Sequence, residues 1–339
     1  MPPMRAPRLA PALLCLLAAG ALLAGCGEDS DESTSAAFEA AESRPAPPKS
    51  EFPSPEGRTL REVVKGADAP AEWIVSPAAV VFYPGKNRYP FGVFDREDGE
   101  ITDAEVALYY ARVPQPKPGA KSEPGNRGQV AKAQGEALDQ PAVGPFPASI
   151  ESLATRPAFR TPPRPDGPEI ASVVYSAQLE FPGEGEWLLA AIVKEDGELK
   201  GTLLQTVAVG ESKRIPKPGE KAPVIHTTTS QDYAETLGKE PIVLLFATPE
   251  FCQSRVCAPV VDVAEQAEKE YGDEAAFIHM DIYNGNDPEN GVRPQVRAFH
   301  LPSEPYLFTI DRKGIVRDAV EGAFGLRLMH EAVDEAIGR

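Results

Sequence analysis

Two cysteines, Cys252 and Cys257, lie five positions apart in the stretch FATPEFCQSRVC. Thiols this close together can form a reversible disulfide, bind a soft metal ion or staple a turn. The apolar run PIVLLF comes before them and the helix-like segment APVVDVAEQAEKEY follows, so the pair lies where a predicted strand meets a predicted helix. The elements around this junction therefore bear on which chemistry the pair carries.

The composition of the chain sets the first limits. Its 339 residues are enough for two domains with apolar cores, and its 36 prolines indicate linkers and long loops. The formal net charge of −17 argues against binding to nucleic acid and against electrostatic docking on anionic lipid.

Residues 1–25 have the pattern of a secretory signal. Arg5 and Arg8 precede the stretch LAPALLCLLAAGALLA, which is too short and too rich in alanine and glycine for a convincing membrane span. The stretch ends in LAGC, which resembles the lipobox of bacterial lipoproteins and implies that Cys26 carries a lipid in the mature protein. We therefore expect a lipoprotein held on the extracytoplasmic face of the cell membrane. An ordinary signal peptide and an uncleaved anchor are the alternatives.

The chain has four cysteines, and the predicted export accounts for two of them. Cys15 leaves with the signal and Cys26 is lipidated, so Cys252 and Cys257 remain as one thiol pair. Outside the cytosol such a pair is usually oxidised or bound to a metal.

Residues 26–70 are rich in acidic residues, serine, alanine and proline, and we expect them to form a disordered tether. From 71 to 211, short apolar or alternating runs separated by turn residues predict an antiparallel β-sandwich, with a proline-rich insertion near 114–168 expected as a long loop. GEGEWLLAAIV resembles a strand of small immunoglobulin-like modules in exported proteins. The region lacks histidine, cysteine and methionine, which argues against a copper store and favours a spacer or protein-binding module.

A short linker is expected at 212–222, and the pattern of residues 223–339 then changes to α/β. Buried strands are predicted at PIVLLFAT and AAFIHMDIY, on either side of an amphipathic helix, which implies a parallel pair. A short helix, two further strands and a final helix follow. The expected order is β-α-β-α-β-β-α.

This order and four local motifs resemble the thioredoxin-like superfamily, best its membrane-anchored thiol–disulfide oxidoreductases. The motifs are PGEKAPVI at the start, VLLFATPEFC at the strand and turn, Pro259 inside the following helix, and SEPYLFTIDRKGIV near the end. The resemblance covers about 216–339 and implies a cis-proline at Pro305 that shapes substrate docking. The chain departs from the family in having C-x-x-x-x-C where C-x-x-C is the hallmark.

The wider spacing has a geometric consequence. Cα atoms five residues apart in an ideal helix lie about 8.7 Å apart, whereas a disulfide tolerates roughly 4.4–6.8 Å. Cys252 must therefore lie in the turn before the helix, or the first helical turn must open. Ser254 is a candidate N-cap, which would leave Cys257 about one turn inside the helix.

The resemblance also implies roles for these residues. Because a helix N-terminus stabilises a thiolate, Cys252 is expected to attack a partner disulfide and Cys257 to resolve the mixed disulfide. Arg255 would favour the thiolate. Glu304 would disfavour it and make the disulfide harder to reduce, unless this residue is simply a solvated loop charge.

Three alternatives remain open. TPEFCQSRVC resembles the stretch of Q-type peroxiredoxins, although Thr248 is four residues before Cys252 where that family has three, and Leu245 stands where it has proline. A copper chaperone would use His300 with Cys252 and Cys257, although its usual spacing is C-x-x-x-C. The third is a redox-inactive scaffold in which the pair is a staple.

The other histidines suggest no further site. We expect His226 and His330 on the surface and His279 as a satisfied, partly buried residue of a strand. The sequence thus predicts a lipid-anchored protein that exchanges thiols and disulfides with exported proteins, with no cofactor, no metal and no nucleic-acid partner. The direction of electron flow stays open.

Overall fold

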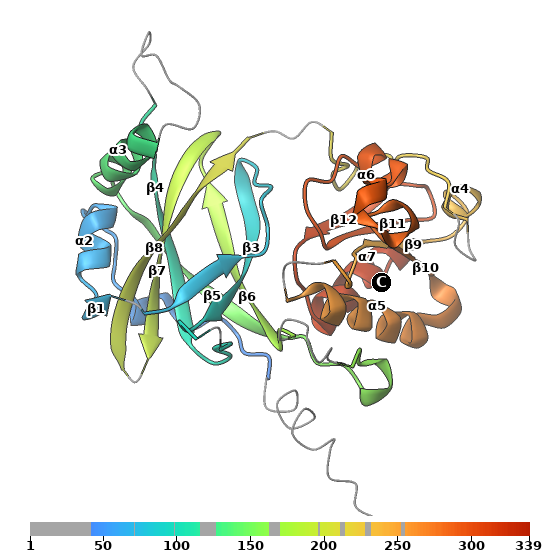
Figure 1. The fold of residues 1–339 in the computed structure, drawn as a ribbon, viewed down its shortest axis with the longest axis horizontal. Coiled ribbons are helices and arrows are strands. Elements are labelled where there is room, and N and C mark those ends of the chain that lie inside the picture. The colour runs from blue at the N-terminus through green and yellow to red at the C-terminus, as the bar shows by residue number, and fades with distance from the viewer. Residues whose placement is uncertain are drawn as a thin grey trace, which may run out of the picture.

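The computed structural model describes residues 42–70, 72–97, 99–115, 127–162, 170–195, 197–210, 214–227, 232–251 and 255–339. These residues form a β domain (42–210) and an α/β domain (214–339) that lie side by side (Figure 1). The signal sequence, Cys26, Cys252 and Ser254 lie outside the described residues. Within the described ranges no helix is both long enough and apolar enough to cross a membrane.

The β domain is built on one eight-stranded sheet with the order β1-β8-β7-β4-β5-β6-β3-β2. The strands are β1 (Ala69–Pro70), β2 (Ile74–Pro77), β3 (Gly85–Phe94), β4 (Glu105–Arg112), β5 (Val143–Ser152), β6 (Val173–Phe181), β7 (Gly185–Glu195) and β8 (Glu198–Val209). All pairings are antiparallel except that of β1 with β8.

This sheet is curled. Strand β5 pairs with β4 through its first half and with β6 through its second half, and Phe82 forms a parallel bridge with Val209 near the end of β8. Aromatic side chains fill the concave side, where Tyr110 contacts Phe146, Phe181 and Trp187. The predicted antiparallel β fold is confirmed, but the predicted sandwich is not, because the strands form a single curled sheet. The immunoglobulin-like character stays a prediction.

The prediction that residues 26–70 form a disordered tether is wrong for residues 42–70, because these residues pack onto the sheet. Helix α2 (Leu60–Lys65) begins with a capping box, in which Thr59 accepts the N–H of Glu62 and the Glu62 carboxylate accepts the N–H of Thr59. Its Leu60 and Val63 are fully buried against β4 and β7. Two buried apolar residues in one short helix give too weak a periodic signal to stand out in an acidic, proline-rich segment.

The prediction that residues 114–168 form a long loop is also wrong. The insertion contains helix α3 (Arg127–Leu138), a 3₁₀ turn η2 (Pro157–Phe159) and strand β5, which lies between β4 and β6 near the middle of the sheet. Pro145, one of the prolines of this insertion, lies where the pairing of β5 with β4 is irregular, so its missing N–H interrupts no regular ladder.

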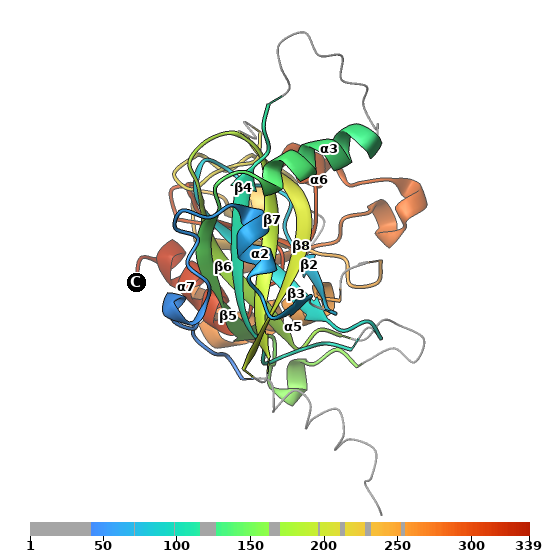
Figure 2. The same cartoon turned by 90° about the vertical axis from the view of Figure 1, so that its left-hand side faces the viewer.

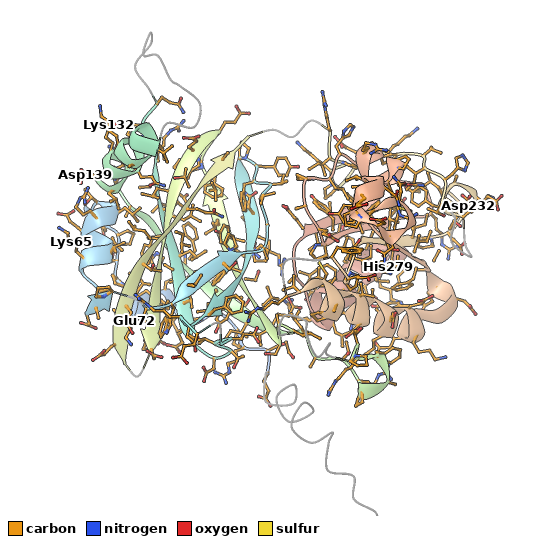
Figure 3. The ribbon with its side chains drawn as sticks, in the orientation of Figure 1. Lys65, Glu72, Lys132, Asp139, Asp232 and His279 are labelled. Atoms are coloured by element: carbon orange, nitrogen blue, oxygen red, sulfur yellow. The ribbon has the colours of Figure 1, made fainter. Side chains whose placement is uncertain are left out.

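Helices α2 and α3 cover the sheet on the side away from the α/β domain (Figure 2). Lys65, Lys132 and Asp139 mark this outer side in Figure 3. The opposite side of the sheet, with β3 and β6, faces the α/β domain (Figure 1).

The α/β domain contains a four-stranded sheet with the order β10-β9-β11-β12. Its strands are β9 (Ile242–Phe246), β10 (Ala276–Met280), β11 (Tyr306–Ile310) and β12 (Val316–Glu321), and its helices are α4 (Tyr233–Thr236), α5 (Cys257–Tyr271), α6 (Pro294–Ala298) and α7 (Leu326–Ile337), with 3₁₀ turns at Gly272–Glu274, Asn284–Asn286 and Pro288–Asn290. Strands β9 and β10 are parallel and the other pairs antiparallel. From β9 onward the predicted order β-α-β-α-β-β-α is confirmed.

Strand β9 is apolar throughout because both of its faces are covered. Val243 and Leu245 pack in one core with residues of α5 and α7. Leu244 and Phe246 pack in a second core with Tyr233 of α4 and residues of α6. The predicted linker is not free either, since Ile215 is buried in this second core and Lys221 bridges Ile315.

The two domains share a continuous interface. Leu153, Ala171 and Val174 of the β domain belong to the same apolar core as α5 and α7. At its edge, the backbone N–H of Arg156 donates to Gln266 (2.7 Å), and the Arg156 guanidinium pairs with Glu270 (2.9 Å).

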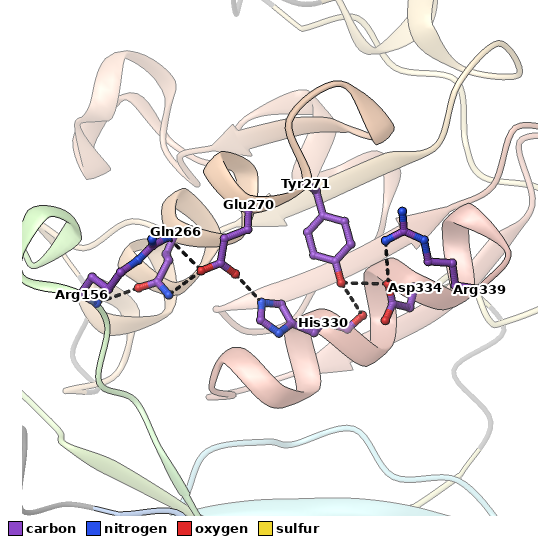
Figure 4. A network of polar contacts seen from close by, with 7 residues as sticks. All are labelled: Arg156, Gln266, Glu270, Tyr271, His330, Asp334 and Arg339. Carbon is purple, nitrogen blue, oxygen red and sulfur yellow. Dashed lines mark hydrogen bonds and ion pairs between the residues drawn. The ribbon is translucent and has the colours of Figure 1, made fainter.

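The same polar network runs on into the α/β domain (Figure 4). Glu270 also contacts His330 (2.8 Å), and the His330 side chain is 38% exposed, as expected of a surface residue. Tyr271 donates to Asp334 (2.9 Å), so α5 and α7 are tied together where α5 meets the β domain. The network thereby links η2 of the β domain to both long helices.

Candidate functional site

Helix α5 presents Cys257 as its first residue. The N-cap is Val256, which makes no side-chain cap, so the prediction that Ser254 caps this helix is wrong, as is the position of Cys257 one turn inside it. Because α5 begins only at Cys257, Cys252 precedes the helix in sequence. The two cysteines therefore need not span about 8.7 Å within one regular helix, the separation that would rule out a disulfide. Pro259 lies within the first turn, where its missing N–H breaks no helical hydrogen bond.

The sulfur of Cys257 is shielded from solvent. The residue is only 1% exposed.

A cis peptide bond joins Glu304 to Pro305 directly before β11, as the sequence predicted for Pro305. Two hydrogen bonds hold this loop in place. The Glu304 carboxylate accepts the backbone N–H of Thr248, just after β9, and the Pro305 carbonyl accepts the N–H of Gly322 (2.9 Å). The cis-proline loop is therefore fixed beside the segment that leads from β9 into the cysteine pair.

Thr248 is the site residue that sequence reasoning undervalued. It is fully buried, its N–H donates to Glu304, and its hydroxyl accepts the N–H of Ile282 (2.7 Å). It thus links β9, the segment after β10 and the cis-proline loop. In the sequence, Thr248 stands out only because it does not match the peroxiredoxin pattern. Its structural role depends on contacts with segments distant in sequence, which the sequence alone does not reveal.

Burial raises the pKa of Glu304 to about 7, opposed by the N–H of Thr248 and reinforced by the charge of Asp281. The interpretation of Glu304 as a solvated loop charge is therefore wrong. Near neutral pH this carboxyl is divided between its neutral and charged forms.

We expect the stability of the protein to depend on pH through Glu304. The folded state holds this proton more tightly than the unfolded chain, so the carboxyl is harmless below its ordinary pKa of 4.5 and destabilising as the pH rises through about 7. Compared with Glu304→Gln, the wild type should lose on the order of 2 kcal/mol of unfolding free energy between about pH 5 and 8, after allowance for partial exposure. Denaturant titrations of both proteins across this range test it. Parallel pH profiles would contradict it.

Arg255 lies just before α5 and points its guanidinium at the β domain. Its guanidinium carbon is 4.9 Å from the centre of the Phe94 ring, a cation–π distance, and its carbonyl accepts the N–H of Ala171 (3.0 Å). The predicted influence of Arg255 on the thiolate stays a prediction, because the attacking Cys252 lies outside the described residues.

The histidines make no metal site with the groups that can be placed. His300 is exposed after α6 with φ of 56°, and His226 is exposed with its ring 3.8 Å from Asp232. His279 differs from expectation because its side chain is exposed on β10, although its Nε2 contacts the Ala247 carbonyl (2.8 Å). Among the described residues no three histidine, cysteine or acidic side chains gather as a metal site would require.

Three solved structures of thioredoxin-like proteins are similar to part of this chain. A thiol:disulfide interchange protein of the thioredoxin family from Chlorobium tepidum TLS is 17% identical, over 38% of this chain and 100% of that one, with a TM-score of 0.28. A thioredoxin-like superfamily protein is 14% identical over 36% and 97%, with a TM-score of 0.28. A thioredoxin-like protein in its oxidised form is 12% identical over 38% and 98%, with a TM-score of 0.27. No family model and no curated protein matches the sequence.

At these identities the similarity says nothing about activity. The element order, the sheet order β10-β9-β11-β12 and the cis-proline before β11 give the α/β domain a thioredoxin-like fold.

Proposed function

We propose that the protein exchanges thiols and disulfides with exported proteins, with Cys252 as the attacking and Cys257 as the resolving cysteine. The observation that carries the proposal is the placement of Cys257. It is buried at the first residue of α5, and the cis-proline loop is hydrogen-bonded to Thr248, in the segment that leads from β9 toward this helix. A staple alone would need neither the cis-proline loop nor a perturbed carboxyl.

The reaction we propose has two substitution steps. The thiolate of Cys252 attacks one sulfur of the partner disulfide, which breaks that bond, forms a mixed disulfide and releases one partner thiolate. The thiolate of Cys257 then attacks Cys252, forms the Cys252–Cys257 disulfide and releases the second partner thiolate. Two electrons pass from the pair to the partner, and the partner thiolates take up two protons. Run in reverse, the same steps oxidise a partner dithiol.

Residues around the pair would tune these steps. The N-terminal end of α5 favours a thiolate near it. Glu304 in its neutral form would leave that thiolate unopposed, and in its charged form it would destabilise the thiolate. Because its pKa is raised to about 7, we propose that Glu304 increasingly destabilises the reduced, thiolate form of the pair as the pH rises through about 7.

The proposal places the protein at the membrane through a lipid on Cys26, with its signal sequence removed and its domains on the extracytoplasmic face. Cys26→Ala should abolish incorporation of labelled fatty acid and move the protein from the membrane to the soluble fraction. Fractionation of cells expressing each variant measures this. A mutant that stays lipid-labelled and membrane-bound would contradict the lipid anchor, and Cys15→Ala serves as the control that leaves anchoring unchanged.

Alkylation mass spectrometry tests the exchange activity itself. The purified protein is incubated with oxidised or reduced dithiothreitol, quenched and labelled, and the masses of peptides containing Cys252 and Cys257 are compared. We expect both cysteines to switch together between a bonded and a doubly labelled form, and to switch back on addition of a disulfide substrate. Labelling of the two cysteines that does not change with the reductant would overturn the proposal.

A further inference from the structure

The β domain is attached directly to the turn that leads into α5. Ala171, just before β6, donates its N–H to the Arg255 carbonyl (3.0 Å), and the Arg255 guanidinium lies 4.9 Å from the centre of the Phe94 ring of β3. Val256 packs against the apolar core that the two domains share. The described flank of the cysteine pair is thus held against β3 and β6.

The β domain is also attached to the strand end beside the cis-proline loop. The Glu321 carboxylate accepts the N–H groups of Val80 (3.0 Å) and Val81 (2.9 Å). The Arg88 guanidinium donates to the carbonyls of Glu321 and Ala323, and burial lowers the pKa of Arg88 to about 10. Separating the domains would leave the buried Arg88 guanidinium without these hydrogen-bond acceptors, which is energetically costly. This contact therefore favours a fixed position of the two domains relative to each other.

A cavity of about 230 Å³ lies at the first of these attachments, beside Arg255. It is lined by residues of β2, β3 and β6 on one side and by Arg255 and Val256 on the other. In the register of β2 with β3, Ile74 is opposite Phe94 and Ser76 is opposite Gly92, and these four side-chain positions face the cavity. The Phe94 ring packs over Gly92, where a Cβ atom would lie 2.6 Å from the ring.

The size and the lining of the cavity favour one kind of occupant. It is smaller than the roughly 300 Å³ at which cofactor and drug-sized pockets begin. Ile74 is 51% exposed at its rim, so an apolar side chain that enters the cavity can contact it. Strand β2 ends the sheet, and none of the described strands pairs with its outer edge. Free strand edges bind extended peptides through the backbone, and adjacent pockets take alternate side chains.

We infer that the β domain supplies the second wall of the substrate cleft, and that this cleft binds an extended, cysteine-bearing peptide segment along β2, with an apolar side chain in the cavity beside Arg255. The inference rests on the proposed function and narrows its substrate class. A flat folded surface cannot enter a cleft whose two walls are fixed together, so the partners are unfolded or flexible exported chains.

Paired tryptophan variants test this inference. Ile74→Trp fills the cavity, whereas Leu203→Trp places the same ring at an equally exposed position of β8 (46% against 51% exposed), near the other end of the sheet order. Each full-length variant is assayed with two substrates in the presence of dithiothreitol. One is an unstructured peptide with a cysteine between valine and leucine, joined as a mixed disulfide to a chromogenic thiol. The other is bis(2-hydroxyethyl) disulfide.

We expect Ile74→Trp to raise KM for the peptide about tenfold and to leave the small disulfide unaffected, while Leu203→Trp changes neither. Ile74→Ala, which removes an exposed side chain and leaves the fold intact, should raise the peptide KM severalfold. Equal peptide kinetics in the Ile74 and Leu203 variants would overturn the inference while leaving the proposed function standing. Failure of the wild type to reduce either substrate would overturn both.

Discussion

Cys252→Ser is expected to lower thiol–disulfide exchange by at least about a hundredfold, because the hydroxyl that replaces the thiolate is a far weaker nucleophile at neutral pH. The measurement is the rate of disulfide reduction with dithiothreitol as the electron donor. Retention of more than about half of the wild-type rate would contradict the assignment of Cys252 as the attacking residue.

Cys257→Ser provides the matched comparison, because it removes the second sulfur and keeps the first. Cys257 is 1% exposed, and serine is close to it in size. This variant should still attack a disulfide but accumulate the mixed disulfide, since no thiolate is present to resolve it. Non-reducing gels and intact mass should show the trapped adduct in Cys257→Ser and none in Cys252→Ser. The opposite pattern would reverse the two roles.

Gly322→Ala is expected to cause the second large effect, at the contact between the domains. Gly322 has φ of +81°, and a Cβ there would lie 2.2 Å from the Ala78 carbonyl oxygen and 2.9 Å from Pro90. Backbone strain and the clash together should lower the unfolding free energy by about 3 kcal/mol, which corresponds to a fall in Tm on the order of 5–10 °C.

Gly238→Ala separates the two causes. Gly238 has a similar φ of +78° but open space at its Cβ position. It should therefore show only the backbone cost, about 1 kcal/mol. Thermal unfolding of both variants measures the difference, and limited proteolysis should cleave Gly322→Ala faster between the domains. Equal destabilisation of the two variants would mean that the Ala78–Gly322 contact does not hold the domains together.

The sequence predicted the α/β domain well because its signals are local. Strand β9 is apolar at every position, α5 and α7 have helical periodicity, and Pro305 stands in a recognisable motif before β11. Each of these features needs only neighbouring residues to be recognised.

The misses share a physical cause, which is dependence on contacts distant in sequence. The prolines of β5 predict a loop, but the segment forms a strand because it pairs with β4 and β6 on either side. Ser254 looks like a cap, yet α5 begins at Cys257, next to an Arg255 carbonyl that accepts the Ala171 N–H. The raised pKa of Glu304 arises from burial by the folded chain. No pattern within ten residues encodes any of the three.

The attachment of the β domain to the redox turn is the feature least visible in the sequence. It depends on Phe94 and Ala171, which are ordinary residues of separate segments. The β domain, expected as a spacer, thereby becomes a neighbour of the site.

The reduction potential of the Cys252–Cys257 pair tests the central claim most directly. The oxidised and reduced fractions of the wild-type protein are measured by alkylation mass spectrometry after equilibration in dithiothreitol and glutathione buffers of known potential. A pair that exchanges with other proteins should have a midpoint between about −120 and −270 mV. A midpoint far below about −300 mV would identify a structural staple and contradict the account.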